Sequence, residues 1–495
     1  MRAQRPGGRR FWQTSILTVV TDHVQPVRAA LTLDPAFRIG PVDRRLFGSF
    51  VEHLGRCVYT GIFEPGHPTA DGQGFRRDVL DLVRELGVSV VRYPGGNFVS
   101  GYRWEDGVGP VEDRPTRLDL AWHTIETNAF GTDEFLAWCR EAGAEPMMAV
   151  NLGTRGMQEA LDLVEYCNHP GGTRLSDLRR AHGAAEPHDV RLWCLGNEMD
   201  GDWQIGAMSA AEYGALAART ARAMRLVDPR VELVACGSSH SGMPTFGSWE
   251  ATVLEHCHDA VDYVSLHSYY DPLGKSVAEF LAGAVDLDRS IEEIIATADH
   301  VAARLRSRKR LKVSVDEWNV WYVSRWDPAS VTEWEPAPRL LEDTYDDVDA
   351  TMVASLMVTL LRHADRVGVG CLAQLVNVIA PIRTEPGGEA RRQTTFAPFA
   401  QIAAAARGSV LRVEPRVATY ESEAGDVPLV DATATYDEET GDLALVLVNR
   451  ATDRPAHVSV DLRAFGDTYG GELEVRLDPV SWRVVRPASA PRPGS

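Results

Sequence analysis

Short apolar segments alternate with amphipathic helical stretches between residue 46 and about residue 377. This alternation predicts βαβ units and a parallel sheet. The eight predicted strands are Leu46–Leu54, Val88–Tyr93, Pro146–Asn151, Arg191–Asn197, Glu232–Ser238, Tyr263–Tyr269, Lys312–Trp318 and Gly370–Asn377. The helical patterns between them include Phe75–Leu86, Asp133–Ala142, Ala210–Leu226, Ile291–Arg306 and Asp347–His363. Eight strands in series predict an α/β fold of the (β/α)8 TIM-barrel class.

Polar or aromatic residues close nearly every predicted strand. Buried parallel strands are normally continuous apolar runs, whereas barrel enzymes place their active sites at the carboxyl ends of the strands. The strand-end residues are Glu52-His53, Arg92-Tyr93, Asn151, Asn197-Glu198, Ser238-Ser239-His240, His267-Ser268-Tyr269, Asp316-Glu317-Trp318 and Gln374/Asn377. Polar residues that simply begin surface loops would explain one such strand better than eight in series. We therefore expect an active site at this end of the barrel.

The pattern changes after about residue 400 to short segments that alternate apolar and polar residues, separated by Gly, Asp and Pro, which predicts a C-terminal antiparallel β-sandwich. The expected strands are Val410–Val413, Leu429–Tyr436, Leu443–Val448, His457–Asp461 and Glu472–Leu477. Ala30–Ile39 has the same strand character and is expected to join the sandwich. The expected organisation is an extension at 1–30, a sandwich strand within 31–45, the catalytic barrel at 46–400, the sandwich at 401–487 and a disordered tail at 488–495.

The N-terminal extension contains Arg9-Arg10 followed by the weakly apolar stretch Phe11–Val20. This arrangement is similar to a twin-arginine export signal, but polar residues interrupt the apolar run and no convincing cleavage site follows. An unstructured extension or an upstream-assigned start codon is the favoured interpretation, and an export signal is the alternative.

The overall charge of −19 argues against nucleic-acid and anionic-membrane partners, which both attract basic surfaces. No apolar run reaches the 18 residues that a transmembrane helix needs. The seven cysteines form no CxxC pair, and an odd number in apolar segments indicates buried, reduced thiols of a cytoplasmic protein. A neutral substrate suits this chain best.

Glu198 and Glu317 each follow directly on, or end, an apolar strand, the fourth and the seventh of the series. Glycoside hydrolysis needs one carboxylic acid to protonate the leaving oxygen and one carboxylate to attack the anomeric carbon or activate water. Two facing carboxylates also oppose each other's ionisation, so one is expected to stay protonated near neutral pH. Either glutamate alone would be interpreted as a solvated loop charge. Together they predict a glycosidase.

Several segments of the chain resemble the family 51 α-L-arabinofuranosidases of the large (β/α)8 glycosidase clan. They are LFGSFVEHLGRCVYTGIFEPGHP, VVRYPGGNFVSGYRWEDGVGP, WCLGNEMDGDWQIG, SLHSYY, DEWNVWY and QLVN. The resemblance runs from about Leu31 to the end of the chain. It implies a retaining, exo-acting enzyme that releases L-arabinose from arabinofuranosyl-containing oligo- and polysaccharides, with no cofactor, and it implies a homo-oligomer, commonly a hexamer.

The resemblance also implies residue roles. Glu198 is expected to be the general acid/base and Glu317 the nucleophile. The remaining roles are substrate contacts: Asn197 to the sugar 2-hydroxyl, Glu52, Asn97 and Gln374 to other furanose hydroxyls, His267 and Tyr269 beside the catalytic carboxylates, and Trp321 as an aromatic wall. The stretch Trp326–Trp334 and the loop Ile382–Thr395 are expected to shape the leaving-group side.

Each of these positions has a structural alternative. Glu52 could form a strand-end ion pair with Arg56 or Arg92, and Asn97 lies in Pro94-Gly95-Gly96-Asn97, a turn signal by composition. His267 could be a core histidine, and Trp321 could be packing beneath the barrel rim. Trp318 is expected to be structural. No histidine pair has a short metal-ligand spacing, and retaining hydrolysis needs no metal, so no metal site is expected.

Two alternative functions remain open. An endoglucanase or xylosidase on the same barrel would use the same two glutamates around a six-membered sugar ring. A non-catalytic sugar-binding protein would keep the pocket without turnover, and the presence of both glutamates argues against it.

Overall fold

The computed structural model describes residues 25–488. Most of the predicted extension, including the alternative export signal, and nearly all of the predicted tail lie outside this range. Val27–Ala30 is an exception, because the first strand, β1, runs from Val27 to Thr32. These four residues therefore belong to the folded protein and not to the extension.

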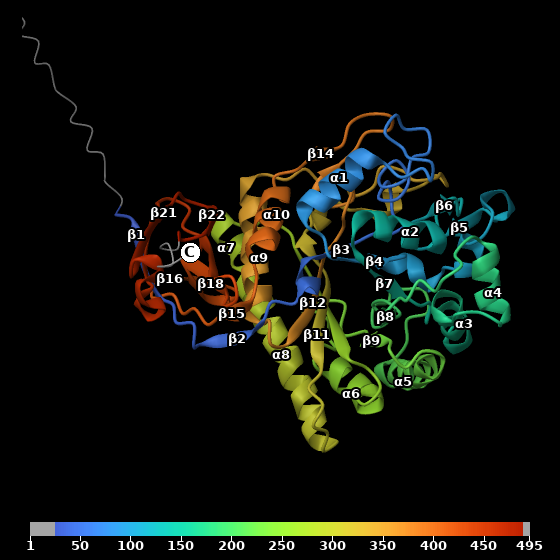
Figure 1. Ribbon diagram of the computed structural model, residues 1–495, viewed down its shortest axis with the longest axis horizontal. Coiled ribbons are helices and arrows are strands. Elements are labelled where there is room, and N and C mark those ends of the chain that lie inside the picture. The colour runs from blue at the N-terminus through green and yellow to red at the C-terminus, as the bar shows by residue number, and fades with distance from the viewer. Residues whose placement is uncertain (1–24, 489–495) are drawn as a thin grey trace, which may run out of the picture.

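Eight parallel strands close a barrel in the order β10-β11-β12-β3-β4-β7-β8-β9 (Figure 1). The eight strands predicted from the sequence are therefore confirmed, together with the (β/α)8 class. Their bounds are β3 Gly48–Phe50, β4 Val90–Tyr93, β7 Glu145–Ala149, β8 Leu192–Leu195, β9 Glu232–Ala235, β10 Tyr263–Tyr270, β11 Lys312–Val320 and β12 Val367–Leu372. The strand predicted at Gly370–Asn377 begins and ends earlier, because Ala373–Asn377 already forms the loop at the barrel mouth.

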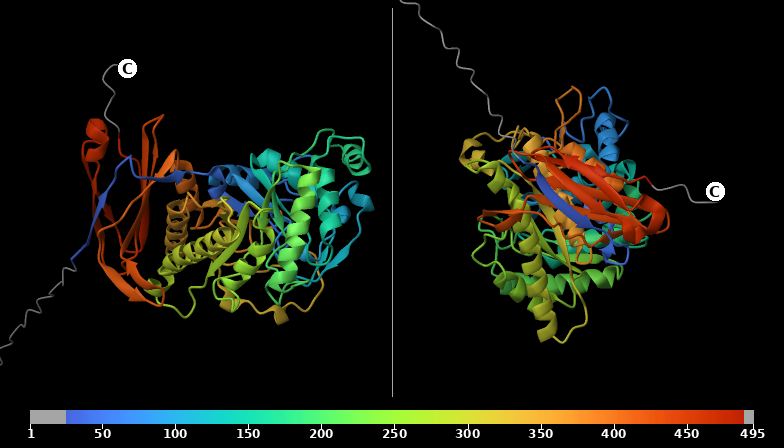
Figure 2. Two further views of the ribbon diagram at one scale, coloured as in Figure 1. Left: turned by 90° about the horizontal axis from the view of Figure 1, so that it is seen from below. Right: turned by 90° about the vertical axis from the view of Figure 1, so that its left-hand side faces the viewer.

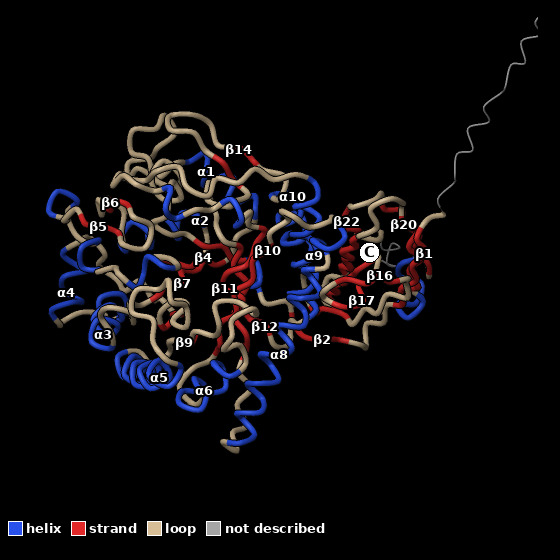
Figure 3. The backbone as a smooth tube through the Cα atoms, turned by 180° about the vertical axis from the view of Figure 1, so that it is seen from behind, coloured by secondary structure: helices blue, strands red, loops and turns tan. Residues whose placement is uncertain are grey.

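Helices surround the barrel (Figure 3). Their bounds are α1 Arg77–Leu86, α2 Thr132–Ala142, α3 Met157–Asn168, α4 Arg174–Ala181, α5 Ala210–Val227, α6 Ser248–Cys257, α7 Val277–Leu281, α8 Gly283–Arg304, α9 Asp347–Arg362 and α10 Phe396–Ala405. The clearest sequence signals are at helix ends: Ser209 caps α5 with Glu212 in a capping box, and α1 stops at Gly87, whose φ of 81° suits glycine. None of the helices among the described residues is long and apolar enough to cross a bilayer.

A β-sandwich of two sheets follows the barrel (Figure 2). The first sheet has the order β2 (Arg38–Pro41), β15 (Ser409–Leu411), β18 (Val430–Asp437), β19 (Asp442–Asn449) and β22 (Ser481–Val485). The second has the order β1, β20 (Ala456–Asp461) and β21 (Glu472–Leu477). Short hairpins are formed by β5 (Arg117–Asp119) with β6 (Thr124–Glu126), β13 (Ile382–Arg383) with β14 (Arg391–Arg392), and β16 (Thr419–Ser422) with β17 (Gly425–Pro428).

The N-terminal segment departs from the prediction in two ways. The single strand expected at Ala30–Ile39 is two strands, β1 and β2, which join different sheets of the sandwich. In addition, β1 runs parallel to β20, with Val27 opposite Ala456, so the sandwich is mostly rather than wholly antiparallel. A parallel pair needs a long connection, and here nearly the whole barrel lies between the two strands.

The sandwich is joined to the barrel through β19 and α9. Leu443, Leu445 and Leu447 of β19 lie in the sandwich core, while the alternate residues Val446 and Val448 pack with the barrel cluster. This explains why β19 is a continuous apolar run instead of an alternating one: both faces are covered. Helix α9 is likewise apolar around its circumference because it lies between the two parts.

The seven cysteines are all buried and unpaired, as the sequence predicts. Cys194 and Cys371 fill the barrel interior together with Val90, Met147 and Leu192. This packed layer lies beneath the carboxyl ends of the strands and closes the barrel, so the polar residues above it form a floor to a site and not the wall of a pore.

Candidate active site

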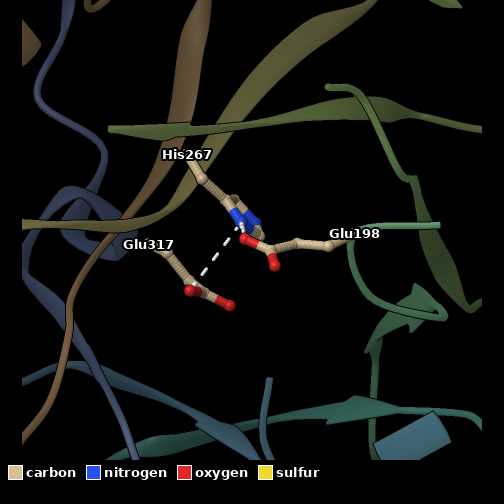
Figure 4. A group of neighbouring side chains, drawn as sticks. All are labelled: Glu198, His267 and Glu317. Carbon is tan, nitrogen blue, oxygen red and sulfur yellow. Dashed lines mark hydrogen bonds and ion pairs between the residues drawn. The ribbon is translucent and has the colours of Figure 1, made fainter. Parts of the chain in front are cut away.

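Glu198 and Glu317 face each other at the carboxyl ends of the barrel strands, with His267 between them (Figure 4). Glu198 lies just beyond β8, and its φ of 45° is an unusual backbone conformation for a residue with a side chain. Glu317 lies within β11, opposite His267 of β10 in the parallel pairing. Carboxylate oxygens of the two glutamates lie within 4.8 Å of each other.

The Glu317 carboxylate is buried and is held at both oxygens. Arg92 Nη1 donates to Oε1 at 2.6 Å, and the Tyr269 hydroxyl donates to Oε2 at 2.7 Å. Tyr269 and His267 reach the same carboxylate because residues two apart on a strand share a face. Burial, followed by the charge of Glu317, raises the pKa of Tyr269 well above its usual value, so the phenol remains a donor.

The Glu198 carboxyl group is held by the ring nitrogens of two side chains. His267 Nδ1 lies 2.9 Å from its Oε1, and Trp203 Nε1 donates to its Oε2 at 2.8 Å. The Glu198 side chain is more exposed than that of Glu317, 12% against 7%. Of the two carboxylates, Glu198 is therefore the more accessible from outside the barrel.

Glu52 follows β3, two strands from β11 in the barrel, and is 1% exposed. Phe98 N and Trp122 Nε1 donate to its Oε1, each at 2.9 Å, and Gln374 Nε2 donates to its Oε2 at 3.1 Å. Burial raises the pKa of Glu52 to about 8, so this carboxyl is mainly protonated at neutral pH.

The glycines of Pro94-Gly95-Gly96-Asn97 are required by Glu52. A Cβ on Gly95 would lie 2.6 Å from Glu52 Cγ, and one on Gly96 would lie 2.7 Å from Glu52 Oε2. Gly95 also has a φ of 146°, which a side chain disfavours. The turn is therefore more than a change of direction, because its bare backbone makes room for the carboxyl group.

The other predicted substrate contacts lie in the same region. Asn197 Nδ2 donates to Asn97 Oδ1 at 3.3 Å, and Asn197 Oδ1 accepts from Arg92 at 2.7 Å. Trp321 packs edge-to-face on Tyr269, with ring centroids 5.2 Å apart. The structure thus brings together all nine residues singled out from the sequence: Glu52, Asn97, Asn197, Glu198, His267, Tyr269, Glu317, Trp321 and Gln374.

The ion pair considered for Glu52 does not form, because both arginines have other partners. Arg56 pairs with Glu342 at 2.7 Å and Arg92 with Glu317, so neither forms the ion pair considered for Glu52. Trp318 is fully buried and stacks on Phe399, and is structural as expected.

Four site residues were not assigned from the sequence. Arg92 and Asp316 were seen only as polar strand ends, although each is 1% exposed and contacts a catalytic candidate or His267. Trp203 lies only five residues after Glu198, within the segment WCLGNEMDGDWQIG, and this closeness in the chain is the signal that could have found it. Trp122 had no local signal, because it lies in the tip of the unpredicted β5–β6 hairpin and reaches Glu52 only through the fold.

Glu198, His267 and Glu317 also have the spacing of a metal-ligand group. Both ring nitrogens of His267 already face carboxylate oxygens, Nδ1 that of Glu198 and Nε2 that of Asp316 at 3.1 Å. A metal ion would have to displace one of these contacts and its proton. The donor set therefore fits a proton-handling site better than a metal site.

Two family models match the chain: the "Alpha-L-arabinofuranosidase 1 domain" over residues 82–286 and the "Alpha-L-arabinofuranosidase C-terminal domain" over residues 316–476. An intracellular exo-α-(1→5)-L-arabinofuranosidase of Streptomyces lividans is 63% identical over 82% of this chain, and the match spans 62% of that relative's length. A protein of the same name from Halalkalibacterium halodurans is 54% identical over 88% of each chain.

Among solved structures, a family 51 α-L-arabinofuranosidase from Bifidobacterium longum superimposes with a TM-score of 0.89 at 45% identity. That alignment covers 94% of this chain and all of the other. The sequence and the fold agree over both the barrel and the sandwich, so this chain belongs to family 51 of the glycoside hydrolases, the family of the α-L-arabinofuranosidases.

Proposed function

We propose that this protein is a retaining, exo-acting α-L-arabinofuranosidase that releases L-arabinose from arabinofuranosyl-containing oligo- and polysaccharides. The observation that carries the proposal is the approach of Glu198 and Glu317 to within 4.8 Å at the barrel mouth. Retaining glycosidases have their carboxyl groups about 5–5.5 Å apart, whereas inverting enzymes need roughly 6.5–9.5 Å to admit a water molecule. The short separation favours direct attack by a carboxylate.

Glu317 is the nucleophile in the first step. Its carboxylate attacks the anomeric carbon, and the glycosidic C–O bond breaks as Glu198 transfers its proton to the leaving oxygen. Arg92 and Tyr269 hold the two oxygens of Glu317 by charge-assisted hydrogen bonds. They keep the nucleophile oriented before the attack and ready to leave afterwards.

Glu198 acts as a base in the second step. It accepts a proton from water, the oxygen of that water bonds to the anomeric carbon, and the ester bond to Glu317 breaks. Two inversions give arabinose with the original anomeric configuration. The greater exposure of the Glu198 side chain supports this assignment, because both the leaving group and the water must reach it.

Sugar recognition is assigned to Glu52, Asn97, Asn197 and Gln374, with Trp321 as an aromatic wall. Gln374 Oε1 is buried and has no hydrogen-bond partner within residues 25–488, so it is available to a sugar hydroxyl. Glu52, protonated at neutral pH, offers a donor as well as an acceptor. A site built to satisfy such buried polar groups rejects sugars that lack the matching hydroxyls.

The names of the two relatives support a substrate and a cellular location for this protein. Both are called exo-α-(1→5) enzymes, which supports α-1,5-linked arabino-oligosaccharides as substrates here. Both are called intracellular, and together with the seven unpaired cysteines this supports a cytoplasmic location. A homo-oligomer, with the hexamer as the expected form, completes the proposal and is testable by light scattering.

The proposal is tested by NMR of the first-formed sugar and by substrate comparison. An α-arabinofuranoside must release α-arabinofuranose first, and an aryl arabinofuranoside must be cleaved in preference to an aryl xyloside or a glucan. Release of the β-anomer would reject the retaining mechanism, and preference for xyloside or glucan would favour the alternative enzymes. Measurable arabinose binding with zero turnover would favour a sugar-binding protein.

The residue roles are tested with three variants. Glu317→Ala is expected to abolish turnover, and azide should restore a glycosyl azide of inverted anomeric configuration. Glu198→Ala should lose least kcat/KM on substrates with good leaving groups, whose departure needs little acid help. Glu292→Gln on the exposed face of α8 serves as the matched control and should be fully active. Ordinary activity in Glu317→Ala would reject the assignment.

A further inference from the structure

Asp316 precedes the nucleophile in the chain but lies below it in the barrel, where it is 1% exposed. Its Oδ1 lies 3.1 Å from Nε2 of His267, and its Oδ2 lies 3.9 Å from Nε of Arg92 and 3.7 Å from Sγ of Cys194. All three partners are themselves buried. Asp316 is out of reach of a substrate and can act on the reaction only through a neighbouring side chain.

His267 is the neighbour that connects Asp316 to the catalytic pair. Its Nδ1 lies 2.9 Å from Glu198 Oε1 and 3.7 Å from Glu317 Oε2. A neutral imidazole has one N–H, whereas the imidazolium has two. Since each ring nitrogen faces a carboxylate oxygen, only the charged ring donates in both directions.

The charged and titratable groups around His267 come from several strands. They are Arg92 of β4, Cys194 of β8, Glu198 after β8, Tyr269 of β10, and Asp316 and Glu317 of β11. Burial opposes the charge on the ring, but Glu317, Asp316 and Glu198 outweigh it and raise the pKa of His267 to about 10. Burial also opposes the charge on Asp316, yet Arg92 and His267 hold its pKa below the usual value. The two groups form a buried ion pair.

We propose that Asp316 is a positioning residue that keeps His267 charged and aimed at Glu198, and thereby holds a positive charge beside the acid/base carboxyl over the working pH range. The inference rests on the proposed acid/base role of Glu198. A neighbouring cation favours the ionised form of a carboxyl group. The charge on His267 therefore favours the carboxylate form that Glu198 needs as the base of the second step. It opposes the protonated form that Glu198 needs as the acid of the first step.

The test is the pH dependence of kcat/KM in Asp316→Asn, measured with an α-1,5-linked arabinobiose whose leaving group needs protonation. Without the Asp316 charge the ring keeps only Glu317 and Glu198 as counter-charges and loses its proton at lower pH. The positive charge beside Glu198 is then absent over part of the working range, and the basic limb of the profile should move up by about one pH unit. An aryl substrate with a good leaving group should show a smaller change. A purely structural role would lower activity at every pH and leave the limb in place.

Asp288 provides the matched control. It pairs with His363 Nε2 at 2.9 Å and with Arg362 at 3.2 Å, so like Asp316 it has a histidine and an arginine as partners. It lies at the side of the barrel that meets the sandwich. Asp288→Asn should leave the pH profile unchanged. An equal shift in both variants would overturn the inference, because the effect would then be one of overall charge.

A double variant tests whether Asp316 acts through His267. In a His267→Gln background the Asp316→Asn change should move the basic limb no further. If Asp316→Asn moves the basic limb equally with and without His267, the proposed route through His267 is overturned. It is also overturned if Asp316→Asn alone leaves the basic limb in place.

Nitrogen-15 NMR of histidine-labelled wild-type enzyme tests the same point without Asp316→Asn, should that variant not fold. One histidine ring should carry protons on both nitrogens at pH 8.5, and its signals should vanish in His267→Gln. The absence of such a ring overturns the inference. If the wild-type enzyme is active but Asp316→Asn does not move the basic limb, or no doubly protonated histidine ring is found, only this inference is rejected. If the wild type is inactive on arabinofuranosides, the proposed function itself is rejected.

Discussion

Replacing Tyr269 with phenylalanine removes one hydrogen bond from Glu317, the proposed nucleophile, and little else. The lost contact is the 2.7 Å bond from the hydroxyl to Glu317 Oε2. The ring remains, so its edge-to-face packing on Trp321 at 5.2 Å is kept. Arg92 still holds the other oxygen of Glu317. The variant therefore isolates the contribution of a single donor.

The expected loss follows from the type of bond. A hydrogen bond to a charged group contributes about 1.5–3 kcal/mol, and each 1.36 kcal/mol of barrier is tenfold in rate. We expect kcat to fall about 10- to 150-fold. The free energy of unfolding should fall by no more than the same hydrogen bond contributes, since no cavity forms and Glu317 keeps one strong partner.

Tyr270→Phe is the matched control for this change. The neighbouring side chain points to the other face of β10, and its hydroxyl donates to Asp286 of α8 at 3.2 Å. This variant loses a similar bond without touching the site and should retain wild-type kcat. The assay is steady-state hydrolysis of an aryl arabinofuranoside with both variants. If Tyr269→Phe stays within twofold of wild type, or if Tyr270→Phe loses as much, the assignment of Tyr269 is refuted.

Three further predictions concern Glu52, its turn and the sandwich. The pKa of Glu52 rises from 4.5 to about 8 on folding. Its carboxyl group therefore contributes stability that is present below pH 4.5 and is lost as the pH rises to about 8. In denaturant unfolding at several pH values, the difference in unfolding free energy between wild type and Glu52→Gln should change across this window and be constant outside it. Gly95→Ala should place a methyl group 2.6 Å from Glu52 Cγ and raise KM for arabinofuranosides. Gly143→Ala, at a positive φ of 74° but with open space around the added methyl group, should affect stability alone. Equal KM values in the two variants would contradict the role of the turn. Asp431→Asn should destabilise the protein by about 3–5 kcal/mol, because it leaves the fully buried Arg450, 2.6 Å away, and Arg362 of α9 without their shared carboxylate; unchanged urea unfolding would show that these charges are solvated.

The barrel was predictable because its signal is local and repeated. Each strand is a short apolar run, and eight of them recur with helical stretches between. The catalytic candidates were predictable for a related reason, since the carboxyl ends of parallel strands converge on one edge. Glu198 and Glu317 are far apart in the chain but had to meet once the strands closed into a barrel.

Predictions failed where packing from distant segments decides the structure. The apolar run in β19 does not alternate, because α9 covers one face and the second sheet covers the other. The N-terminal strand β1 pairs in parallel with β20, a choice made by the surface it must bury and not by its own residues. The hairpin that carries Trp122 has too few residues in each strand to leave a periodic pattern.

By itself, the sequence determined the eight-stranded barrel, the end of the barrel where the candidate site lies and the two carboxylates proposed to do the chemistry, because strand periodicity and strand ends are properties of neighbouring residues. Only the tertiary structure decided which groups control those carboxylates. Arg92 and Trp203 donate to them, Asp316 contacts His267 between them, and Trp122 donates to Glu52 instead. Each effect depends on approaches of about 3–4 Å between charges and dipoles in a medium of low dielectric. That geometry exists only when the strands have closed.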